Sequence, residues 1–471
     1  MMYKFLDTLK KYEDVIAFRF LDEENTFEIS YKQYLEDICS CAFRLESAVG
    51  NLKGKHIGII GVNSYEYAVI MAATLFSRAV LVPINYHETD DNIKYVIDNS
   101  RLEVLIANNP KKYACDSNIK CFDFDIALNH GDGQQKDLLD FSQEEADNLL
   151  MIIYTSGTTS LSKGVCLSVH NIFHEEKILL PEKFVREYNA VPGFKAYINF
   201  PFYHIAGIIA WIACAEHGYT LIQSVKPQNI LSDLIGEEIS GAGVIPATLK
   251  LWLNSIRKGH IERLGGVKCI ITAGAPVSAE DVKEIQSHGI AFGQYYGMTE
   301  TGGNVTYNFD MEKHIASVGC AYDDVDIKIV DGEICIKSSG NMMGYYENEE
   351  ETMNCLKDGM IYTGDLGYLD DDGYLYITGR KKNLIILSGG ENVSPEELEK
   401  QLYKNPLIIE CKVFEKNDRI YAGINSREED QEKIRTYITE LNKKMPIYKR
   451  IYKIEFQDNE FEKTASGKIK R

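Results

Sequence analysis

Short strand-like runs alternate with helix-like segments along the first 300 residues, and this alternation is the strongest constraint on the fold. Segments 56–62, 102–107 and 267–273 are apolar runs of strand length, as expected for buried strands. Segments 65–76 and 279–287, between them, have the pattern of helices. Alternation of this kind predicts an α/β fold with layered, largely parallel sheets.

The pattern changes from about residue 325. Three short segments there, 326–330, 332–337 and 373–378, alternate apolar and polar residues and are joined by Asp-Gly turns, which predicts a β-rich subdomain. Further on, Ser394 is followed by Pro and two Glu residues, a typical helix start. We expect a large N-terminal domain over 1–379 and a small α+β C-terminal domain over 384–471, joined through 380–383.

Composition and charge exclude several classes of function. A net charge of -19 argues against nucleic-acid binding, which needs Lys and Arg to neutralise phosphates. The N-terminus lacks a signal-peptide pattern, and the apolar stretches 67–83 and 205–214 are interrupted by Arg78 or too short to span a bilayer. The 11 cysteines are scattered, without metal or redox spacing. We therefore expect a cytoplasmic protein without stable membrane insertion.

The segment 153–165 is the strongest local motif. A strand-like run leads into Thr-Ser-Gly-Thr-Thr-Ser-Leu-Ser, then Lys163, then a second apolar run. Small residues let backbone N–H groups approach a phosphate, while hydroxyls and the lysine add donors and charge. It is not a Walker loop, because Ser162 replaces the second glycine and Gly164 stands where Ser or Thr should bind Mg²⁺. The same composition also suits an exposed Ser/Thr-rich loop.

This segment resembles the signature of the adenylate-forming (ANL) superfamily, which contains acyl-CoA synthetases, peptide-synthetase adenylation domains and luciferases. Ser160 and Ser162 depart from it, since Gly and Pro are usual there. The resemblance covers roughly residues 63–471. Further segments resemble the family's motifs in the family's order: Pro201–Gly207, Thr272–Pro276, Gln294–Glu300, Tyr362–Asp365, Ile377–Arg380 and Thr464–Lys468.

The resemblance implies an AMP-forming acid–thiol ligase that uses ATP and Mg²⁺, with a mobile C-terminal domain that turns about a hinge at Lys382. It implies that Glu300 binds Mg²⁺ and that Lys163, His204, Thr299 and Lys468 are catalytic. The residues that it implies in nucleotide binding are Thr155, Ser156, Gly157, Thr158, Thr159, Lys163, Gly274, Ala275, Pro276, Gln294, Tyr295, Tyr296, Gly297, Met298, Thr299, Asp365, Ile377, Arg380 and Lys468.

The carboxylate substrate is expected to be apolar. Amino-acid-activating relatives place an Asp where this chain has Ile205, and a buried ammonium without a partner is costly. The motifs resemble both aryl-acid and fatty-acid ligases, and the sequence leaves that choice open. It also leaves open whether the thiol is CoA or a carrier-protein phosphopantetheine, and whether the adenylate feeds a luciferase-like oxygenation. The expected acyl-pocket residues are His204, Ile205, Gly207, Trp211, Gly302 and Gly303.

Overall fold

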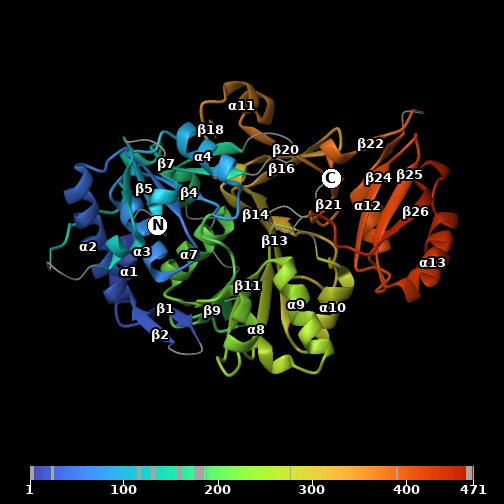
Figure 1. The fold of residues 1–471 in the computed structure, drawn as a ribbon, viewed down its shortest axis with the longest axis horizontal. Coiled ribbons are helices and arrows are strands. Elements are labelled where there is room, and N and C mark those ends of the chain that lie inside the picture. The colour runs from blue at the N-terminus through green and yellow to red at the C-terminus, as the bar shows by residue number, and fades with distance from the viewer. Residues whose placement is uncertain are drawn as a thin grey trace.

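The computed structural model describes residues 5–22, 26–113, 118–128, 134–155, 162–173, 185–186, 188–275, 277–388, 391–462 and 469. Two large sheets dominate it (Figure 1). The nine-stranded sheet has the order β15-β14-β13-β12-β11-β9-β10-β1-β2, with bounds β1 Ile16–Leu21, β2 Phe27–Ser30, β9 Lys195–Ile198, β10 Thr220–Ser224, β11 Gly241–Val244, β12 Cys269–Thr272, β13 Ala291–Met298, β14 Gly303–Asn308 and β15 Cys320–Ala321. The seven-stranded sheet has the order β18-β8-β7-β4-β3-β5-β6, with bounds β3 His56–Ile60, β4 Val80–Ile84, β5 Val104–Ala107, β6 Lys120–Phe122, β7 Leu149–Thr155, β8 Lys163–Ser168 and β18 Gly344–Tyr345.

The central strands of both sheets are parallel and buried on both faces, which explains their continuous apolar runs. In β3, Ile57 and Ile59 belong to the core between the sheets, whereas Ile60 belongs to a core on the outer face. Helices α1 Phe5–Lys11, α2 Tyr31–Val49, α3 Tyr65–Phe76, α5 Val169–Phe173 and α7 Ile205–His217 contribute to the middle core. Helices α8 Ile230–Asp233, α9 Pro246–Arg257 and α10 Ala279–Ser287 contribute to the outer core of the nine-stranded sheet. Helix α4 Asp90–Asn99 contributes to the outer core of the seven-stranded sheet.

A five-stranded, antiparallel sheet follows the two large ones. Its apolar residues Ile334, Ile336 and Leu375 pack against Tyr296 and Val305 of the nine-stranded sheet. This contact brings its strand ends next to β13. The strands are β16 Asp326–Val330, β17 Glu333–Lys337, β19 Leu356–Lys357, β20 Met360–Leu369 and β21 Leu375–Arg380, and the helix α11 Glu349–Cys355 lies before β19.

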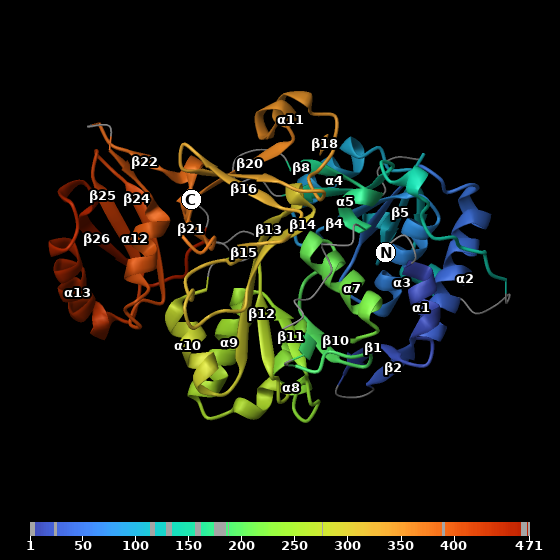
Figure 2. The ribbon, with the colours of Figure 1, turned by 180° about the vertical axis from the view of Figure 1, so that it is seen from behind.

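The C-terminal part has a core of its own, formed by apolar residues between 385 and 456. Ser394 caps its first helix, as predicted, and also donates a hydrogen bond to the Thr378 carbonyl at 2.9 Å. Both views place this part at one end of the molecule, beyond β21 (Figures 1 and 2). Its elements are β22 Ile385–Ile386, β23 Asn392–Val393, α12 Pro395–Leu402, β24 Glu410–Glu415, β25 Ile420–Asn425, α13 Gln431–Lys443 and β26 Ile451–Gln457.

Arg78, which interrupts the apolar stretch 67–83, holds the segment before β7 against the middle helices. Its guanidinium forms an ion pair with Glu145 at 2.9 Å and lies 4.8 Å from the Phe141 ring centroid. It also donates hydrogen bonds to the carbonyls of Leu139 and Asp140. The role of Arg78 is therefore structural. In the described part of the chain, no helix is both long and apolar enough to cross a membrane.

Candidate active site

The hairpin of β7 and β8 places Lys163 opposite Thr155. The two residues pair across its end, and the Thr155 hydroxyl donates to the Lys163 carbonyl at 3.4 Å. The expected phosphate loop therefore starts after Thr155 and ends at Lys163, and these two residues lie side by side at the end of the hairpin. Four residues expected to bind phosphate lie outside the described residues: Ser156, Gly157, Thr158 and Thr159.

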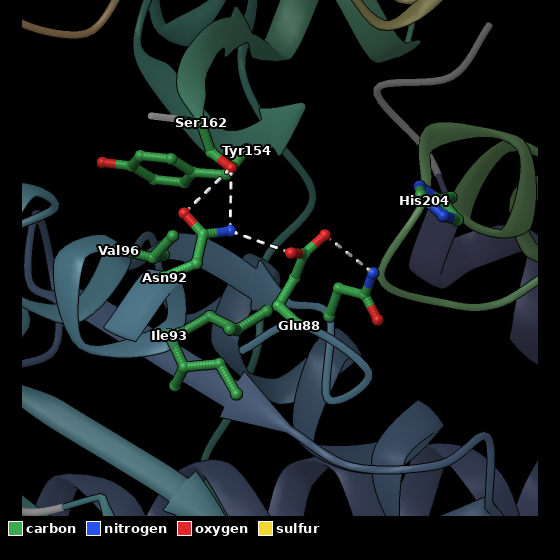
Figure 3. A pocket seen from close by; sticks show the side chains of 9 residues that line it. Glu88, Asn92, Ile93, Val96, Tyr154, Ser162 and His204 are labelled. Carbon is green, nitrogen blue, oxygen red and sulfur yellow. Dashed lines mark hydrogen bonds between the residues drawn. The ribbon is translucent and has the colours of Figure 1, made fainter. Parts of the chain in front are cut away.

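A chain of hydrogen bonds ties the residue before Lys163 to helix α4 (Figure 3). Nδ2 of Asn92 donates to the Ser162 hydroxyl at 3.0 Å, and Ser162 donates back to the side-chain Oδ1 of Asn92 at 3.2 Å. Glu88 accepts from Asn92 at 3.1 Å and from Asn85 at 3.4 Å. Ser162, at the family's usual proline position, is thus held by hydrogen bonds. The sequence pattern gave no signal for Asn92.

The segment around Tyr345 connects Lys163 with Glu300. The Met342 amide donates to the Glu300 carbonyl at 2.9 Å, and Gly344 pairs with Cys166 of β8. The Tyr345 hydroxyl donates to Oε1 of Glu300 at 2.9 Å, while its ring centroid lies 5.3 Å from Nζ of Lys163. One tyrosine therefore contacts both the expected phosphate-binding lysine and the expected metal ligand.

Two further residues near Tyr345 were missed from the sequence. Glu351, from helix α11, accepts a hydrogen bond from the Lys163 ammonium and forms an ion pair with it. The Cys355 thiol lies 3.8 Å from the Tyr345 hydroxyl, and burial raises the pKa of this thiol to about 11. Cys355 is therefore protonated at neutral pH and is a poor nucleophile.

Glu300 is buried, and this burial raises the pKa of its carboxyl above the ordinary value of 4.5. The Tyr345 hydrogen bond and the positive charges of Arg380 and Lys163 oppose the shift. A hard oxygen donor in this position suits Mg²⁺, which takes one or two carboxylates together with phosphate and water oxygens. Among the described residues no three His, Cys, Asp or Glu side chains form a metal-binding group, so Mg²⁺ here would need phosphate and water ligands.

Asp365, Arg380 and Tyr296 meet at the joint between the five-stranded and nine-stranded sheets. Asp365 and Arg380 are opposite each other in the β20–β21 pair, and Nε of Arg380 lies 2.5 Å from Oδ1 of Asp365. The Tyr296 hydroxyl donates to Oδ2 of Asp365 at 2.9 Å. Arg380 and Tyr296 therefore hold both oxygens of the buried Asp365 carboxylate. Ile377 packs against the apolar cluster that contains Tyr296.

The strands that carry the adenine-side motifs are neighbours. Thr272 of β12 pairs with Gln294 of β13, so Gly274 and Ala275, just past β12, follow the strand next to Gln294 and Tyr295. Pro276 lies outside the described residues. Gly297, Met298 and Thr299 end β13 and start the turn to Glu300. A Cβ at Gly297 would lie 2.0 Å from the Gly303 carbonyl oxygen, so only glycine permits this approach of β14.

The structure brings some of the expected acyl-pocket residues together. A Cβ built on Gly303, which follows Gly302, would lie 3.1 Å from Ile209 and 3.7 Å from Ile205 of α7. His204 precedes α7 and lines the small cavity beside Ser162 (Figure 3). A Cβ at Gly207 would lie 2.1 Å from the Pro201 carbonyl oxygen, so this glycine lets α7 start close to that turn.

Trp211 contacts helices α1 and α2. It is 1% exposed, its indole donates to the Tyr34 hydroxyl of α2 at 3.1 Å, and its ring centroid lies 5.3 Å from that of Phe5 in α1. It lies six residues after Ile205, which turns it to another side of α7. Its side chain packs in the middle core, to which Ile205 and Ile209 also belong, so a place for Trp211 at the acyl pocket stays a prediction.

The expected hinge residue, Lys382, is the middle residue of the turn Lys381–Asn383, which follows β21. Burial lowers the pKa of its ammonium, and the positive charges of Arg380 and Lys163 lower it further. Lys382 therefore lies within electrostatic reach of the site. Lys468, the expected catalytic lysine, lies outside the described residues.

Comparison with known proteins gives a family match over most of the chain. A model of the family "AMP-binding enzyme" matches residues 5–346. A 2-succinylbenzoate–CoA ligase of Bacillus cereus (strain AH820) is 25% identical over 94% of this chain and 92% of its own length.

Solved structures share the fold. ATP-bound MatB from Rhodopseudomonas palustris superposes with a TM-score of 0.85 at 24% identity, covering 100% of this chain and 97% of that one. O-succinylbenzoate coenzyme A synthetase from Bacillus subtilis, in complex with ATP and a magnesium ion, has a TM-score of 0.79 at 24% identity, covering 99% and 98% of the two chains. The α/β architecture predicted from the sequence is thereby confirmed.

Proposed function

Since the chain belongs to the AMP-binding enzyme family of AMP-forming acid–CoA ligases, we propose that it activates an apolar carboxylic acid with ATP and transfers the acyl group to CoA. The observation that carries the proposal is the arrangement around Tyr345. Tyr345 contacts both Lys163 and Glu300. Arg380 forms an ion pair with Asp365, and its positive charge lowers the pKa of the Glu300 carboxyl. These groups offer a site for a phosphate chain, a metal and a ribose in one place.

In the first step, a carboxylate oxygen of the acid would attack the α-phosphorus of ATP. The bond from the α-phosphorus to the bridging oxygen breaks, and pyrophosphate leaves with that electron pair. Lys163 would bind the β- and γ-phosphates, and Asp365 would accept hydrogen bonds from the ribose hydroxyls in place of those from Tyr296 and Arg380. Thr299 would contact the α-phosphate. Positioning and charge neutralisation would carry the step.

Glu300 is the residue that would hold Mg²⁺, which supplies charge neutralisation on the phosphates. The relative from Bacillus subtilis is described with ATP and a magnesium ion, which supports this assignment. The Tyr345 hydroxyl keeps one Glu300 oxygen hydrogen-bonded and stabilises the carboxylate form that a metal needs.

The acid is proposed to be an aryl or fatty acid. Ile205 is buried at the start of α7, where an amino-acid substrate would require a carboxylate partner. Ile205 and Ile209 lie against Gly303, which makes an apolar wall with room left by the glycine. His204 would lie at the entrance of this pocket. The similar 2-succinylbenzoate–CoA ligase is named for an acid with a benzoate ring, which supports the aryl choice.

In the second step, the small C-terminal domain is proposed to turn about Lys382, withdraw Lys468 and admit the thiol. Lys468→Ala is expected to abolish acyl-adenylate formation and to spare thioester formation from a supplied acyl-adenylate. Lys382→Pro is expected to slow thioester formation more than adenylation. Equal loss of both half-reactions in Lys468→Ala would contradict its role.

The experiment that tests the whole proposal is carboxylate-dependent exchange of pyrophosphate into ATP, measured over aryl, short-, medium- and long-chain acids. Exchange with an apolar acid is expected, and its absence across the panel would overturn the proposal. A second round would compare CoA with a phosphopantetheinylated carrier protein as acceptor. Turnover with free CoA is expected, while transfer only to the carrier protein would make the chain a stand-alone loading enzyme.

A further inference from the structure

The ion pair between Lys163 and Glu351 lies at the point where a polyphosphate is proposed to bind. Glu351 is one of three consecutive glutamates in the first turn of α11, with Glu349 and Glu350. Its carboxylate receives the hydrogen bond from the Lys163 ammonium, and the side chains are 30% (Lys163) and 41% (Glu351) exposed. Glu350 is an exposed neighbour on the same turn.

Strand pairing and hydrogen bonds to the backbone fix the position of Glu351 relative to Lys163. Strand β18 pairs with β8, the strand that starts at Lys163. The Tyr345 amide donates to the Thr352 hydroxyl at 2.8 Å, and that hydroxyl donates to the Asn348 carbonyl at 2.7 Å. The Asn348 side chain accepts from the Glu351 amide at 3.1 Å. The first turn of α11 is thus attached to the strand that carries the lysine.

The position of Glu351 is unfavourable for a bound polyphosphate. A half-exposed ion pair contributes little net stability, so phosphate oxygens can replace the carboxylate on Lys163. Once replaced, the Glu351 carboxylate remains close to a ligand of the same sign, and like charges repel. Both effects weaken binding of a ligand that uses Lys163. A ligand without β- and γ-phosphates does not compete with the pair.

We propose that Glu351 is a displaceable counter-ion that competes with polyphosphate for Lys163. It weakens binding of ATP and of pyrophosphate, recovers Lys163 when pyrophosphate leaves, and is indifferent to AMP. Glu351 is a positioning residue, since it acts through Lys163. The inference rests on the proposed function because it takes Lys163 as the ligand of the β- and γ-phosphates.

The test compares Glu351→Gln with Glu350→Gln, which removes the same charge from the same helix turn without touching Lys163. Dissociation constants for ATP, inorganic pyrophosphate and AMP are measured by titration calorimetry at fixed Mg²⁺ and ionic strength. Glu351→Gln is expected to bind ATP and pyrophosphate about three- to ten-fold more tightly, and to change AMP binding by less than about two-fold. Glu350→Gln is expected to change all three by less than about two-fold. Glu351→Ala is expected to act in the same direction as Glu351→Gln.

Weaker ATP binding by Glu351→Gln, equal effects of the two Gln variants, or equal tightening of AMP would each overturn the proposal. The Lys163→Ala variant distinguishes a failure of the counter-ion role of Glu351 from a failure of the proposed function. If Lys163→Ala leaves ATP and pyrophosphate binding unchanged, the phosphate role of Lys163 is wrong. If Lys163→Ala weakens both ligands but Glu351→Gln has no effect, only the counter-ion role is wrong. In a Lys163→Ala background, the gain from Glu351→Gln is expected to disappear.

Discussion

The Tyr345 hydroxyl donates a hydrogen bond to Oε1 of Glu300 at 2.9 Å. Burial alone would keep the Glu300 carboxyl protonated to a higher pH, and this hydrogen bond opposes that effect. Tyr345 lies in β18 of the seven-stranded sheet, Glu300 lies in the turn after β13 of the nine-stranded sheet, and the two are 45 positions apart in the chain. Glu300 must be ionised to bind a metal although it is buried, and the Tyr345 hydroxyl offsets part of the rise in pKa that burial causes.

Tyr345→Phe is expected to raise the pKa of Glu300 further, because the bond that favours the carboxylate is lost while the ring beneath Lys163 remains. Because Glu300 must be ionised to bind Mg²⁺, the acidic limb of the pH profile of pyrophosphate release would move to higher pH. The Mg²⁺ concentration for half-maximal rate would rise about ten-fold. Tyr346→Phe, the adjacent residue, is the control. Superimposable pH profiles for Tyr345→Phe and the wild type would contradict the assignment.

Glu300→Gln is expected to stabilise the folded protein near pH 7 while reducing pyrophosphate release about 100-fold or more. A carboxyl with a raised pKa stabilises the fold below 4.5, and that contribution is lost as pH rises through the pKa of the folded state. The neutral amide avoids this loss, with a gain of about 1 kcal/mol in the free energy of unfolding. The gain should shrink as pH falls towards 4.5. Urea unfolding over that range measures it, and a gain independent of pH would argue against Glu300 as its source.

Asn92→Ala is expected to raise the KM for ATP about five-fold, since it removes the side chain that holds Ser162 beside Lys163. Ser162→Ala should have a similar effect, and the double variant should be no worse than either single one because both changes break one contact. Lys94→Ala, exposed on the same helix, is the control. Additive effects of Asn92→Ala and Ser162→Ala would show that the contact does not act as a unit.

Arg78→Ala is expected to lower the free energy of unfolding by about 3 kcal/mol, because a partly buried Glu145 loses its positive partner and two carbonyls lose the guanidinium donor. Arg101→Ala is a matched control, since Arg101 also has a positive φ but its side chain is 70% exposed in its pair with Glu347. That change should cost about 1 kcal/mol or less. The KM for ATP of folded Arg78→Ala should equal that of the wild type, and a changed KM would require a role in the site.

The sequence predicted the elements with strong periodicity well. The helices at 65–76 and 279–287 and the strand at 326–330 have the predicted bounds. The strand predicted from residue 102 begins at Val104 instead, because the amides of residues 101 and 102 bond back to the end of α4. Strand ends depend on pairing with neighbours, which periodicity does not encode.

Contacts between distant segments could not be predicted. Glu351 is one of three adjacent glutamates, and nothing in its sequence surroundings distinguishes it as the partner of a lysine 188 positions away. Arg78 likewise had no explanation until its contacts with 139–145 were visible. The hydrogen bond from Trp211 to Tyr34 was likewise hidden, because a helix turns successive residues to different sides and the sequence does not show what each side meets.

The separate core of the C-terminal part has a consequence for how the protein melts. The apolar cluster between 385 and 456 shares no residue with the clusters of the two large sheets in the described chain. Two cores of this kind behave as two cooperative units, so heat absorption on unfolding should show two transitions. A single melting temperature would then report whichever unit unfolds in the observed range, and a variant in one unit would leave the other transition in place.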